Sequence, residues 1–406
     1  MTMQDVAMST AEEPMQRGPG YLTPGESGVS WMLDPTHSVL KGHAARQAAG
    51  PDSPADYTDY IADAEALKHL LRYRHVAVVL DPRRADTTDA VVDRWALDLL
   101  HRKPGTAAEC AGSLGKDLGL ALADGHLHVR HGQHHRPVKK VAGEDPGPPW
   151  EAATYAETRV VRIRSLDGSD GRDTSLRAGS DNNAADFSFP KLIVDLRGNG
   201  GGDDSYVISW FSPYVSEHWV LPCEETSMTL ASSGSSIAFW NYAAWLGFNH
   251  HTVPDAFQQH KPQPADRIVT CTQPGAVVVP AQAAPVKARA PWTGRMIVVI
   301  DGGTGSSAES AALLLKSAFN AVLVGTPSYG VIDYGNSAPY YLPISGMEIH
   351  LPSQANDWGT AVDFVGIQPD VAVPAGIGIE AVVSRFDEFH AAGSGRPDLS
   401  ESVRAN

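Results

Sequence analysis

The sequence predicts an α/β fold, and three observations support this prediction. Short apolar runs that fit buried strands, such as those that open the stretches 191–202 and 296–310, end in glycines. Each run is followed by a segment whose apolar residues recur at helical spacing. Strand and helix alternate in this way through the second half of the chain, which indicates a parallel or mixed sheet with helices packed on it. The chain has 406 residues and exceeds one ordinary hydrophobic core, so we expect more than one domain.

The first part of the chain predicts a small, mainly helical N-terminal domain over 57–126. Apolar residues follow a helical period at the start of this domain and again over 90–101, and a weaker third helix is expected over 107–123. Between the first two helices, the apolar run 76–80 predicts a short buried strand. Residues 1–56 are rich in Pro, Gly, Ser and Asp, so we expect an extended arm there.

After this domain, we expect a strand and linker segment over 127–190, an α/β core over 191–385 and a flexible tail over 386–406. The linker segment contains an alternating strand at 158–163 and then a polar loop over 165–183. Within the core, turns rich in glycine and proline separate the remaining elements. We expect helices over 203–214, 237–248 and 307–319, strands over 296–300, 321–324, 340–343 and 347–351, and a connector over 280–291.

Composition excludes several classes of partner. The formal net charge of -15 argues against nucleic acids and anionic membrane surfaces. No apolar run is long enough to span a bilayer, and the first residues lack the basic and apolar regions of a secretion signal. The cysteines, 3 in number and far apart, favour a reducing compartment over a disulfide framework. We therefore expect a cytoplasmic protein that binds neither nucleic acid nor membrane, and a homo-oligomer stays open.

The sequence contains no motif for a metal or a nucleotide cofactor. Neither a His-Glu-x-x-His pattern nor a phosphate-binding loop is present. The histidine-rich run over 131–140 lacks the cysteine and carboxylate neighbours of a strong metal site, so we predict a solvated loop there. We therefore expect a protein that works without cofactor or metal.

Two glycine turns carry the candidate chemistry. Residues 197–202 (Arg-Gly-Asn-Gly-Gly-Gly) follow the first apolar strand and can offer backbone N–H groups to an anion. Residues 301–305 (Asp-Gly-Gly-Thr-Gly) follow the second strand, and Ser306 and Ser307 stand where the next helix begins. A serine at this position is either an ordinary N-cap or a nucleophile beside an oxyanion hole. The presence of both turns favours an acyl-transfer site.

Five short segments occur in one order along the chain: 124–126 (Asp-Gly-His), 192–202, 301–309, 321–330 and 365–370. In this order they resemble the family of C-terminal processing (tail-specific) serine proteases, with the related tricorn core protease and retinoid-binding modules. The resemblance covers roughly residues 57–373 and implies a crotonase/ClpP-like β-α spiral core. The glycine-rich carboxylate-binding loop of a PDZ module is not recognisable between His126 and Lys191. We therefore expect this core without a PDZ module.

The resemblance also implies a nucleophile and an oxyanion hole. The family's nucleophile falls on Ser306, three residues before Glu309. One oxyanion N–H would come from Ser307, and the other from the glycine run at Gly200 and Gly201. A helix that starts at Ser307 would aim the positive end of its dipole at the developing negative charge.

Two branches of this family activate the serine differently. Tail-specific proteases use a lysine, which is absent at the matching position of this chain. The tricorn-like branch uses a histidine and an orienting carboxylate, and the resemblance places them at His126 and Asp363. That branch usually has glutamate at the second position and serine before the histidine, where this chain has Gly125. Asp333 and Glu348 are the alternative carboxylates, and His126 by itself also fits a packed structural histidine.

We therefore expect a serine peptidase that hydrolyses peptide bonds through an acyl-enzyme on Ser306. His126 would act as general base, and Asp363 would orient it. The expected substrate is a peptide or a small acyl compound. Two alternatives stay open: an esterase, acyl-transfer or peptide-tailoring enzyme that uses the same site, and a non-catalytic module that binds an apolar ligand.

Overall fold

The computed structural model describes residues 57–102, 106–131, 147–168, 172–216, 219, 228–230, 269–270, 277–280, 290–342 and 344–394. The chain divides into two units, and each has a hydrophobic core of its own. Each unit combines three separate stretches of sequence. The domains expected from the sequence are contiguous ranges, so the two units do not test them and they stay a prediction. Unit 1 consists of Met1–Ala142, Ser227–Ala281 and Tyr334–Ala355, and unit 2 of Gly143–Thr226, Gln282–Asp333 and Asn356–Asn406.

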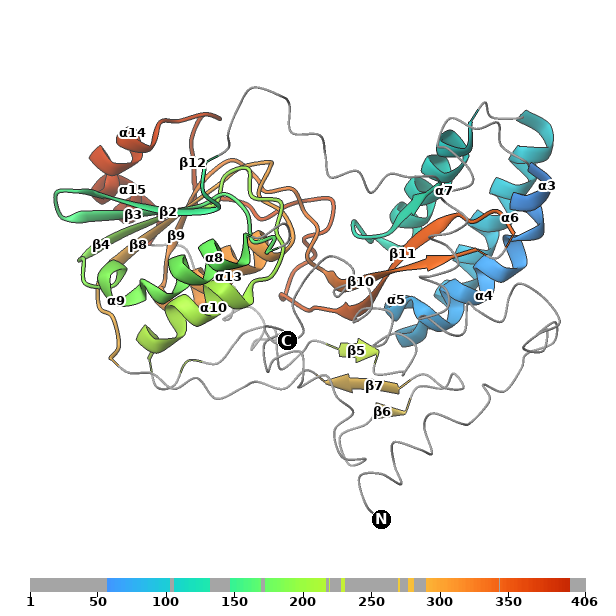
Figure 1. The fold of residues 1–406 in the computed structure, drawn as a ribbon, viewed down its shortest axis with the longest axis horizontal. Helices are drawn as coiled ribbons and strands as arrows, with labels where there is room; N and C mark the ends of the chain where they lie inside the picture. Colours follow the sequence, from blue (N-terminus) through green and yellow to red (C-terminus); the bar gives the residue numbers. More distant parts are fainter. Residues whose placement is uncertain are drawn as a thin grey trace, which may run out of the picture. The chain divides into compact units, whose positions relative to one another are not determined.

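The sheet of unit 2 confirms the predicted alternation of strands and helices (Figure 1). Its strand order is β12-β9-β8-β4-β3-β2, and every pair of neighbours is parallel except β2 and β3. The strands are β2 (Trp150–Tyr155), β3 (Thr158–Ile163), β4 (Lys191–Asp195), β8 (Arg295–Ile300), β9 (Val322–Gly325) and β12 (Val371–Ala372). The helices are α8 (Asp173–Asp181), α9 (Asn183–Asp186), α10 (Ser205–Phe211), the 3-10 helix η2 (Ser212–Tyr214), α13 (Ser307–Phe319), α14 (Ile379–Ser384) and α15 (Phe386–Gly393).

Helices cover both faces of this sheet (Figure 1). Leu192 and Val194 of β4 belong to the same apolar cluster as Leu314 of α13. Ile193, between them, belongs to the cluster around Phe386 of α15. Successive strand residues point to opposite faces, so a strand that is covered on both faces buries consecutive residues, and in β4 and β8 only the first residue is not fully buried. This burial explains why the strands are continuous apolar runs in the sequence.

Helix α8 corrects one of the predictions. We expected a polar loop over 165–183, but Asp173–Asp181 is helical. The helix buries only Leu176 and Ser180, so its apolar period is too short to detect in the sequence. The Ser180 hydroxyl donates a hydrogen bond of 2.9 Å to the carbonyl oxygen of Tyr206 and ties α8 to α10.

Helix α15 corrects a second prediction. We expected a flexible tail from residue 386, but Phe386–Gly393 forms a helix that packs on the sheet. Phe386 and Phe389 are 1% and 2% exposed, and they fill the cluster that β4, β8 and β9 present on this face. Residues beyond 394 lie outside the described part of the chain.

Phe389→Ala should lower the free energy of unfolding by about 3–5 kcal/mol, because it leaves a cavity in the apolar cluster under α15. Urea unfolding followed by circular dichroism measures this loss. Glu388→Ala is the matched control, since Glu388 lies on the same helix and is exposed. We expect its unfolding midpoint to stay close to that of the wild type. Equal midpoints for the two variants would contradict the packing of α15 on the sheet.

Unit 1 confirms the predicted N-terminal helices and adds a sheet of distant segments (Figure 1). Its strand order is β1-β11-β5-β7-β6, with β10 also paired to β11, and all these pairs are antiparallel. The predicted strand pair near 340–351 is therefore confirmed. The helices are α3 (Tyr57–Ala62), α4 (Ala64–Arg74), α5 (Val76–Leu80), α6 (Arg84–Arg102) and α7 (Ala107–Leu122). The strands are β1 (His128–Arg130), β5 (Met228–Leu230), β6 (Val269–Thr270), β7 (Val277–Pro280), β10 (Tyr334–Tyr341) and β11 (Glu348–Ala355).

The strand expected over 76–80 is wrong, because these residues form helix α5. His75 begins this helix, and its Nδ1 accepts a hydrogen bond of 3.2 Å from the backbone N–H of Ala77. The residues from Val76 to Val79 are all buried. A short helix that is apolar on every side shows no helical period, and its sequence looks the same as that of a buried strand.

Several predictions fall on residues that the structure does not describe. They are the arm over 1–56, the helix over 237–248, and nearly all of the histidine-rich run over 131–140 and of the connector over 280–291. Among the described residues, the helices are too short or too polar to cross a bilayer.

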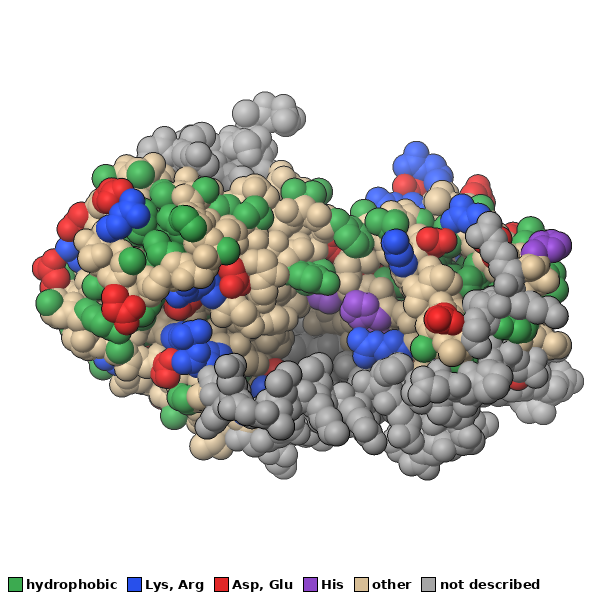
Figure 2. Space-filling model, turned by 90° about the horizontal axis from the view of Figure 1, so that it is seen from above, with side chains coloured by type: hydrophobic (Ala, Val, Ile, Leu, Met, Phe, Trp, Pro, Cys, Tyr) green, Lys and Arg blue, Asp and Glu red, His purple; other side chains and the backbone are tan. Residues whose placement is uncertain are grey.

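Charged side chains of both signs are mixed on the face of the molecule seen in Figure 2. Lys and Arg side chains lie among Asp and Glu side chains there. Surface ion pairs such as Arg385–Glu388 and Arg295–Asp387 join opposite charges in unit 2. The net charge of -15 is therefore not gathered into one acidic patch on that face.

Candidate active site

Three turns meet at one edge of the unit 2 sheet. Strands β4, β8 and β9 are parallel neighbours, so the turns that follow them lie at the same edge. The turn after β8 is bonded to both of the others. The Gly305 N–H donates to the carbonyl oxygen of Asn199 at 2.9 Å, and the Tyr329 N–H donates to that of Thr304 at 2.8 Å. The structure therefore brings the two predicted glycine turns together.

Side chains within these turns hold them in place. The Asp301 carboxylate accepts backbone N–H groups of Gly198 and Gly303, each at 2.9 Å. The Thr304 hydroxyl donates to the carbonyl oxygen of Leu196 at 3.0 Å and is fully buried. These bonds cross between the β4 and β8 turns, so the spacing of the two turns is set by side chains as well as by the sheet.

Ser306 has a strained backbone at the start of α13. Its φ is 52° and its ψ is -126°, whereas an ordinary N-cap residue has an extended backbone with negative φ. A residue with a side chain in such a region costs about 1–3 kcal/mol, and the surrounding structure must hold it there. The Ser306 N–H donates to the Glu309 carboxylate at 3.0 Å, and the Ala308 N–H donates to the Gly305 carbonyl oxygen at 3.1 Å. Strain of this kind is typical of functional sites.

Glu309, which the sequence places at the first turn of this helix, also has distant partners that the sequence did not reveal. It is fully buried, and its carboxylate also accepts the N–H groups of Gly330 at 2.7 Å and Val331 at 2.9 Å and the hydroxyl of Ser328. Burial raises the pKa of Glu309, and the hydrogen bonds act in the opposite direction. One side chain thus joins the first turn of α13 to the turn after β9. The acceptors and donors are about twenty residues apart in sequence, so no local pattern could predict them.

The glycine run lies directly against Ser306. Gly201 has φ 102°, and a β-carbon placed on it would lie 2.8 Å from the Ser306 β-carbon and 3.0 Å from the Ser307 nitrogen. Its own N–H donates to Asn199 Oδ1 at 2.9 Å, so it is already bonded. Gly200 is exposed, and its N–H has no acceptor within the described residues.

Two backbone donors therefore remain near Ser306. Ser307 is the first residue of α13, and the N–H groups of the first turn have no partner within a helix. The Ser307 and Gly200 N–H groups are therefore both available near Ser306, and their role as the two oxyanion donors stays a prediction. The Gly201 N–H is used inside the turn instead.

Asp363 is a buried side chain in a loop of unit 2. Its Oδ1 accepts the Asp333 N–H at 2.9 Å, and Asp333 in return accepts the Asp363 N–H at 3.0 Å. The Phe364 N–H donates to the Gly330 carbonyl oxygen at 2.9 Å, which ties this loop to the turn after β9. Asp333 also accepts the Val362 N–H, so its carboxylate holds the loop. The choice of Asp363 over Asp333 as the orienting carboxylate stays a prediction.

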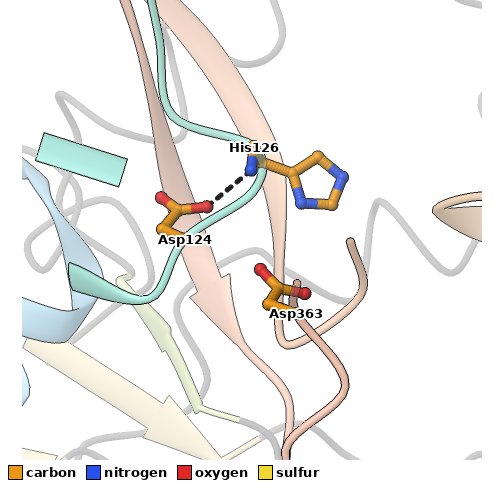
Figure 3. Close-up of side chains that lie close together, drawn as sticks. All are labelled: Asp124, His126 and Asp363. Atoms are coloured by element: carbon orange, nitrogen blue, oxygen red, sulfur yellow. Dashed lines mark hydrogen bonds between the residues drawn. The ribbon is translucent and has the colours of Figure 1, made fainter. Parts of the chain in front are cut away.

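His126 lies in unit 1, in the short connection between α7 and β1. Its backbone N–H donates to Asp124 Oδ1 at 2.7 Å (Figure 3). Burial lowers the pKa of the His126 imidazole, and the charge of Asp124 acts in the opposite direction. Glu348, the other alternative carboxylate, pairs with His350 in the same unit. The joint action of His126 with Ser306 and Asp363 stays a prediction.

The described lysines of unit 2 form ion pairs away from Ser306. Lys191 stands at the amino end of β4 and pairs with Glu157 at 2.5 Å and Asp387 at 2.9 Å. Lys316 pairs with Asp370 at 2.5 Å and lies about 15 Å along α13 from its start. Neither of these two side chains is placed to activate a serine at the start of α13.

Comparison with protein families identifies the chain. The model of peptidase family S41 matches residues 160–373, which is more than half of the 406 residues. The chain belongs to peptidase family S41. Family membership makes this S41 protein a serine-type peptidase, a hydrolase, and confirms the resemblance to processing proteases. The matched range includes the three turns, Ser306 and Asp363.

Several solved structures are similar to this chain at low sequence identity. Mature CPAF matches with a TM-score of 0.50 and 11% identity, over 84% of this chain and 95% of that chain. A lipoprotein from Streptococcus agalactiae matches with a TM-score of 0.46 and 14% identity, over 81% of this chain and 96% of that chain. The photosystem II D1 C-terminal processing protease matches with a TM-score of 0.36 and 13% identity, over 58% of this chain. The match spans 52% of that protease, which is about half of its length. The sequence matches no curated protein.

Proposed function

We propose that this S41 peptidase hydrolyses peptide bonds through an acyl-enzyme on Ser306. The observation that carries the proposal is the strained backbone of Ser306 at the start of α13. The surrounding turns hold the strain, and they place Gly201 against the serine. An ordinary capping box includes the bond from the Ser306 N–H to Glu309, but it does not need the positive φ or the close approach of Gly201, whereas a nucleophile on a sharp strand-to-helix turn does.

His126 acts as the general base in this proposal. It takes the proton from the Ser306 hydroxyl as the oxygen attacks the carbonyl carbon of the peptide, and it then gives the proton to the departing amine. Water next attacks the acyl carbon while His126 takes a proton from it, and His126 then returns that proton to the Ser306 oxygen as the acyl–oxygen bond breaks and the acid product leaves. The positions of Lys191 and Lys316 support a histidine base over a lysine base.

The Gly200 and Ser307 N–H groups hold the oxyanion of the tetrahedral intermediate. The α13 dipole adds positive potential at the same point, because the helix begins at Ser307. Asp363 accepts the second imidazole N–H of His126, which selects the tautomer and stabilises the imidazolium. The use of Asp333 and Glu348 in other contacts supports the choice of Asp363.

The finer features of the fold belong to the same proposal. The repeated strand and helix of unit 2 support a crotonase/ClpP-like spiral core, and the sequence between His126 and Lys191 supports a chain without a PDZ module. We expect the enzyme to act on peptides in the cytoplasm, without a cofactor or a metal, as a monomer or a homo-oligomer. Family membership favours peptide hydrolysis over ester chemistry and over simple binding of an apolar ligand.

A fluorophosphonate probe tests the nucleophile directly. We expect the probe to label the wild-type protein once, and peptide mass spectrometry should locate the adduct on Ser306. A peptide-library screen run beside an ester panel then identifies the substrate class. An adduct on another residue, or no adduct at all, would contradict the assignment of Ser306.

The pH dependence of kcat/KM should report on His126. A general base works only in its neutral form, so the rate falls as pH drops through the pKa of the imidazole. Burial places that pKa below its ordinary value of 6.5, so activity should persist into mildly acidic solution. The measurement is kcat/KM between about pH 4 and pH 8 with a substrate that has no ionisable group in this range. An acid limb above 6.5 would contradict a His126 base whose pKa is set mainly by burial.

A further inference from the structure

A buried histidine–aspartate pair lies beside His126 in unit 1. The Nε2 atom of His75 and the Oδ2 atom of Asp124 are 2.9 Å apart, and both side chains are 0% exposed. The two residues are 49 positions apart in sequence. The other carboxylate oxygen of Asp124 accepts the backbone N–H of His126 at 2.7 Å (Figure 3). One carboxylate thus joins His75 to the main chain of His126.

The hydrogen bonds of His75 define its tautomer. Its Nδ1 accepts the Ala77 N–H at 3.2 Å, so Nδ1 carries no proton. Its Nε2 therefore carries the proton and donates it to Asp124. The edge of the Tyr334 ring packs against the imidazole, with the ring centres 5.8 Å apart. The imidazole is thus oriented by the start of α5 on one side and by Asp124 on the other.

The connection that carries His126 is also held at the end of α7. This helix ends at Ala123, whose φ is 53°, and the Asp124 N–H donates to the Gly119 carbonyl oxygen at 2.9 Å. The backbone of Asp124 is therefore attached to α7 and its side chain to His75. Its carboxylate then determines the direction in which the chain continues to His126.

The stability of unit 1 does not require a buried histidine–aspartate pair at this place. Burying a histidine and a carboxylate carries a desolvation penalty, and apolar residues of similar volume are often as stable or more stable. An apolar residue at position 124, however, would leave the His126 N–H without its acceptor. The pair therefore contributes mainly to the placement of His126.

We propose that His75 and Asp124 are positioning residues for the general base: they hold the main chain at His126, so that its imidazole is presented in one orientation. The inference rests on the proposed function, because it assumes that His126 is the base. Neither residue contacts the reacting atoms. A displacement of the base by about 1 Å lowers the rate about 100-fold, so the loss of either positioning residue should lower kcat strongly.

Asp124→Asn tests this arrangement with little change in shape. The asparagine oxygen can still accept the His126 N–H, but its NH2 group then faces the Nε2–H of His75. The asparagine NH2 group and the Nε2–H of His75 are then two donors that face each other. His75 cannot avoid this by moving its proton to Nδ1, because Nδ1 would then face the Ala77 N–H as a second donor. We expect kcat to fall about 100-fold while KM changes little.

A double-mutant cycle with His126→Ala separates positioning from general damage. If Asp124 acts through His126, Asp124→Asn should change the residual kcat of the His126→Ala enzyme by less than about twofold. If Asp124 only stabilises the fold, the two losses should multiply. Multiplied losses would overturn the inference and leave the proposed function intact. Full activity of His126→Ala would overturn the proposed function and the inference with it.

His75 offers a second, conservative comparison, which serves if Asp124→Asn does not fold. His75→Gln keeps an N–H donor for Asp124, whereas His75→Leu fills the space without a donor. We expect His75→Gln to recover most of the kcat that His75→Leu loses, at a temperature where circular dichroism shows both variants folded. Equal kcat values for these two variants would overturn the inference.

Discussion

Replacing Ser306 with alanine should abolish peptide hydrolysis, with a loss in kcat on the order of 10⁶-fold. The hydroxyl is the proposed nucleophile, and alanine keeps the β-carbon and the backbone, so the fold should not change. Since the strain at φ 52° comes from having a β-carbon, it should persist in this variant. The measurements are steady-state hydrolysis of the best library peptide and labelling by the fluorophosphonate probe.

Two further variants make this test specific. Ser306→Gly should be equally inactive but more stable than Ser306→Ala by about 1 kcal/mol, because glycine relieves the strain. Ser307→Ala keeps the backbone N–H and loses only the hydroxyl bond to the Gly202 carbonyl oxygen, so it should keep most of the activity. Turnover by Ser306→Ala at a rate near that of the wild type would refute the nucleophile.

Local patterns in the sequence predict the central strands of unit 2 and the helices that follow β4 and β8, but not β2, α8 or α15. The strands β4, β8 and β9 are visible because both of their faces are buried, which makes their central residues a continuous apolar run. The start of α13 is visible because glycines end β8 and a helical period then begins. These signals extend over fewer than about twenty residues, and they place Ser306 and the glycine run at one edge of the sheet.

Contacts between distant segments account for what the sequence could not predict. The bond from Gly330 to Glu309 and the bond between His75 and Asp124 each join residues that no local period relates. The strand expected in place of α5 failed for a related reason, since its side chains are buried by other segments on all sides. Equally, the bond that occupies the Gly201 N–H depends on the fold of the turn and not on its composition.

Gly201→Ala should lower kcat/KM about 100- to 1000-fold, because it disturbs the turn that faces the nucleophile. Gly201 has φ 102°, which a residue with a side chain adopts only under strain. Its new β-carbon would lie 2.8 Å from the Ser306 β-carbon and 2.9 Å from the Gly305 carbonyl oxygen. Since neither neighbour is the end of a flexible side chain, the turns must move apart, and the serine moves with them.

Gly200→Ala is the matched control in the adjacent position. A β-carbon on Gly200 meets no atom within 4 Å, and its backbone does not lie in the left-handed region. Alanine there also keeps the N–H that we assign to the oxyanion hole, so kcat/KM should fall far less, by about tenfold at most. Steady-state kinetics of the two variants, with circular dichroism to verify folding, makes the comparison. Equal kinetics for both would mean that contact with the glycine run does not hold Ser306 in place, and the strain at Ser306 would then lose its link to catalysis.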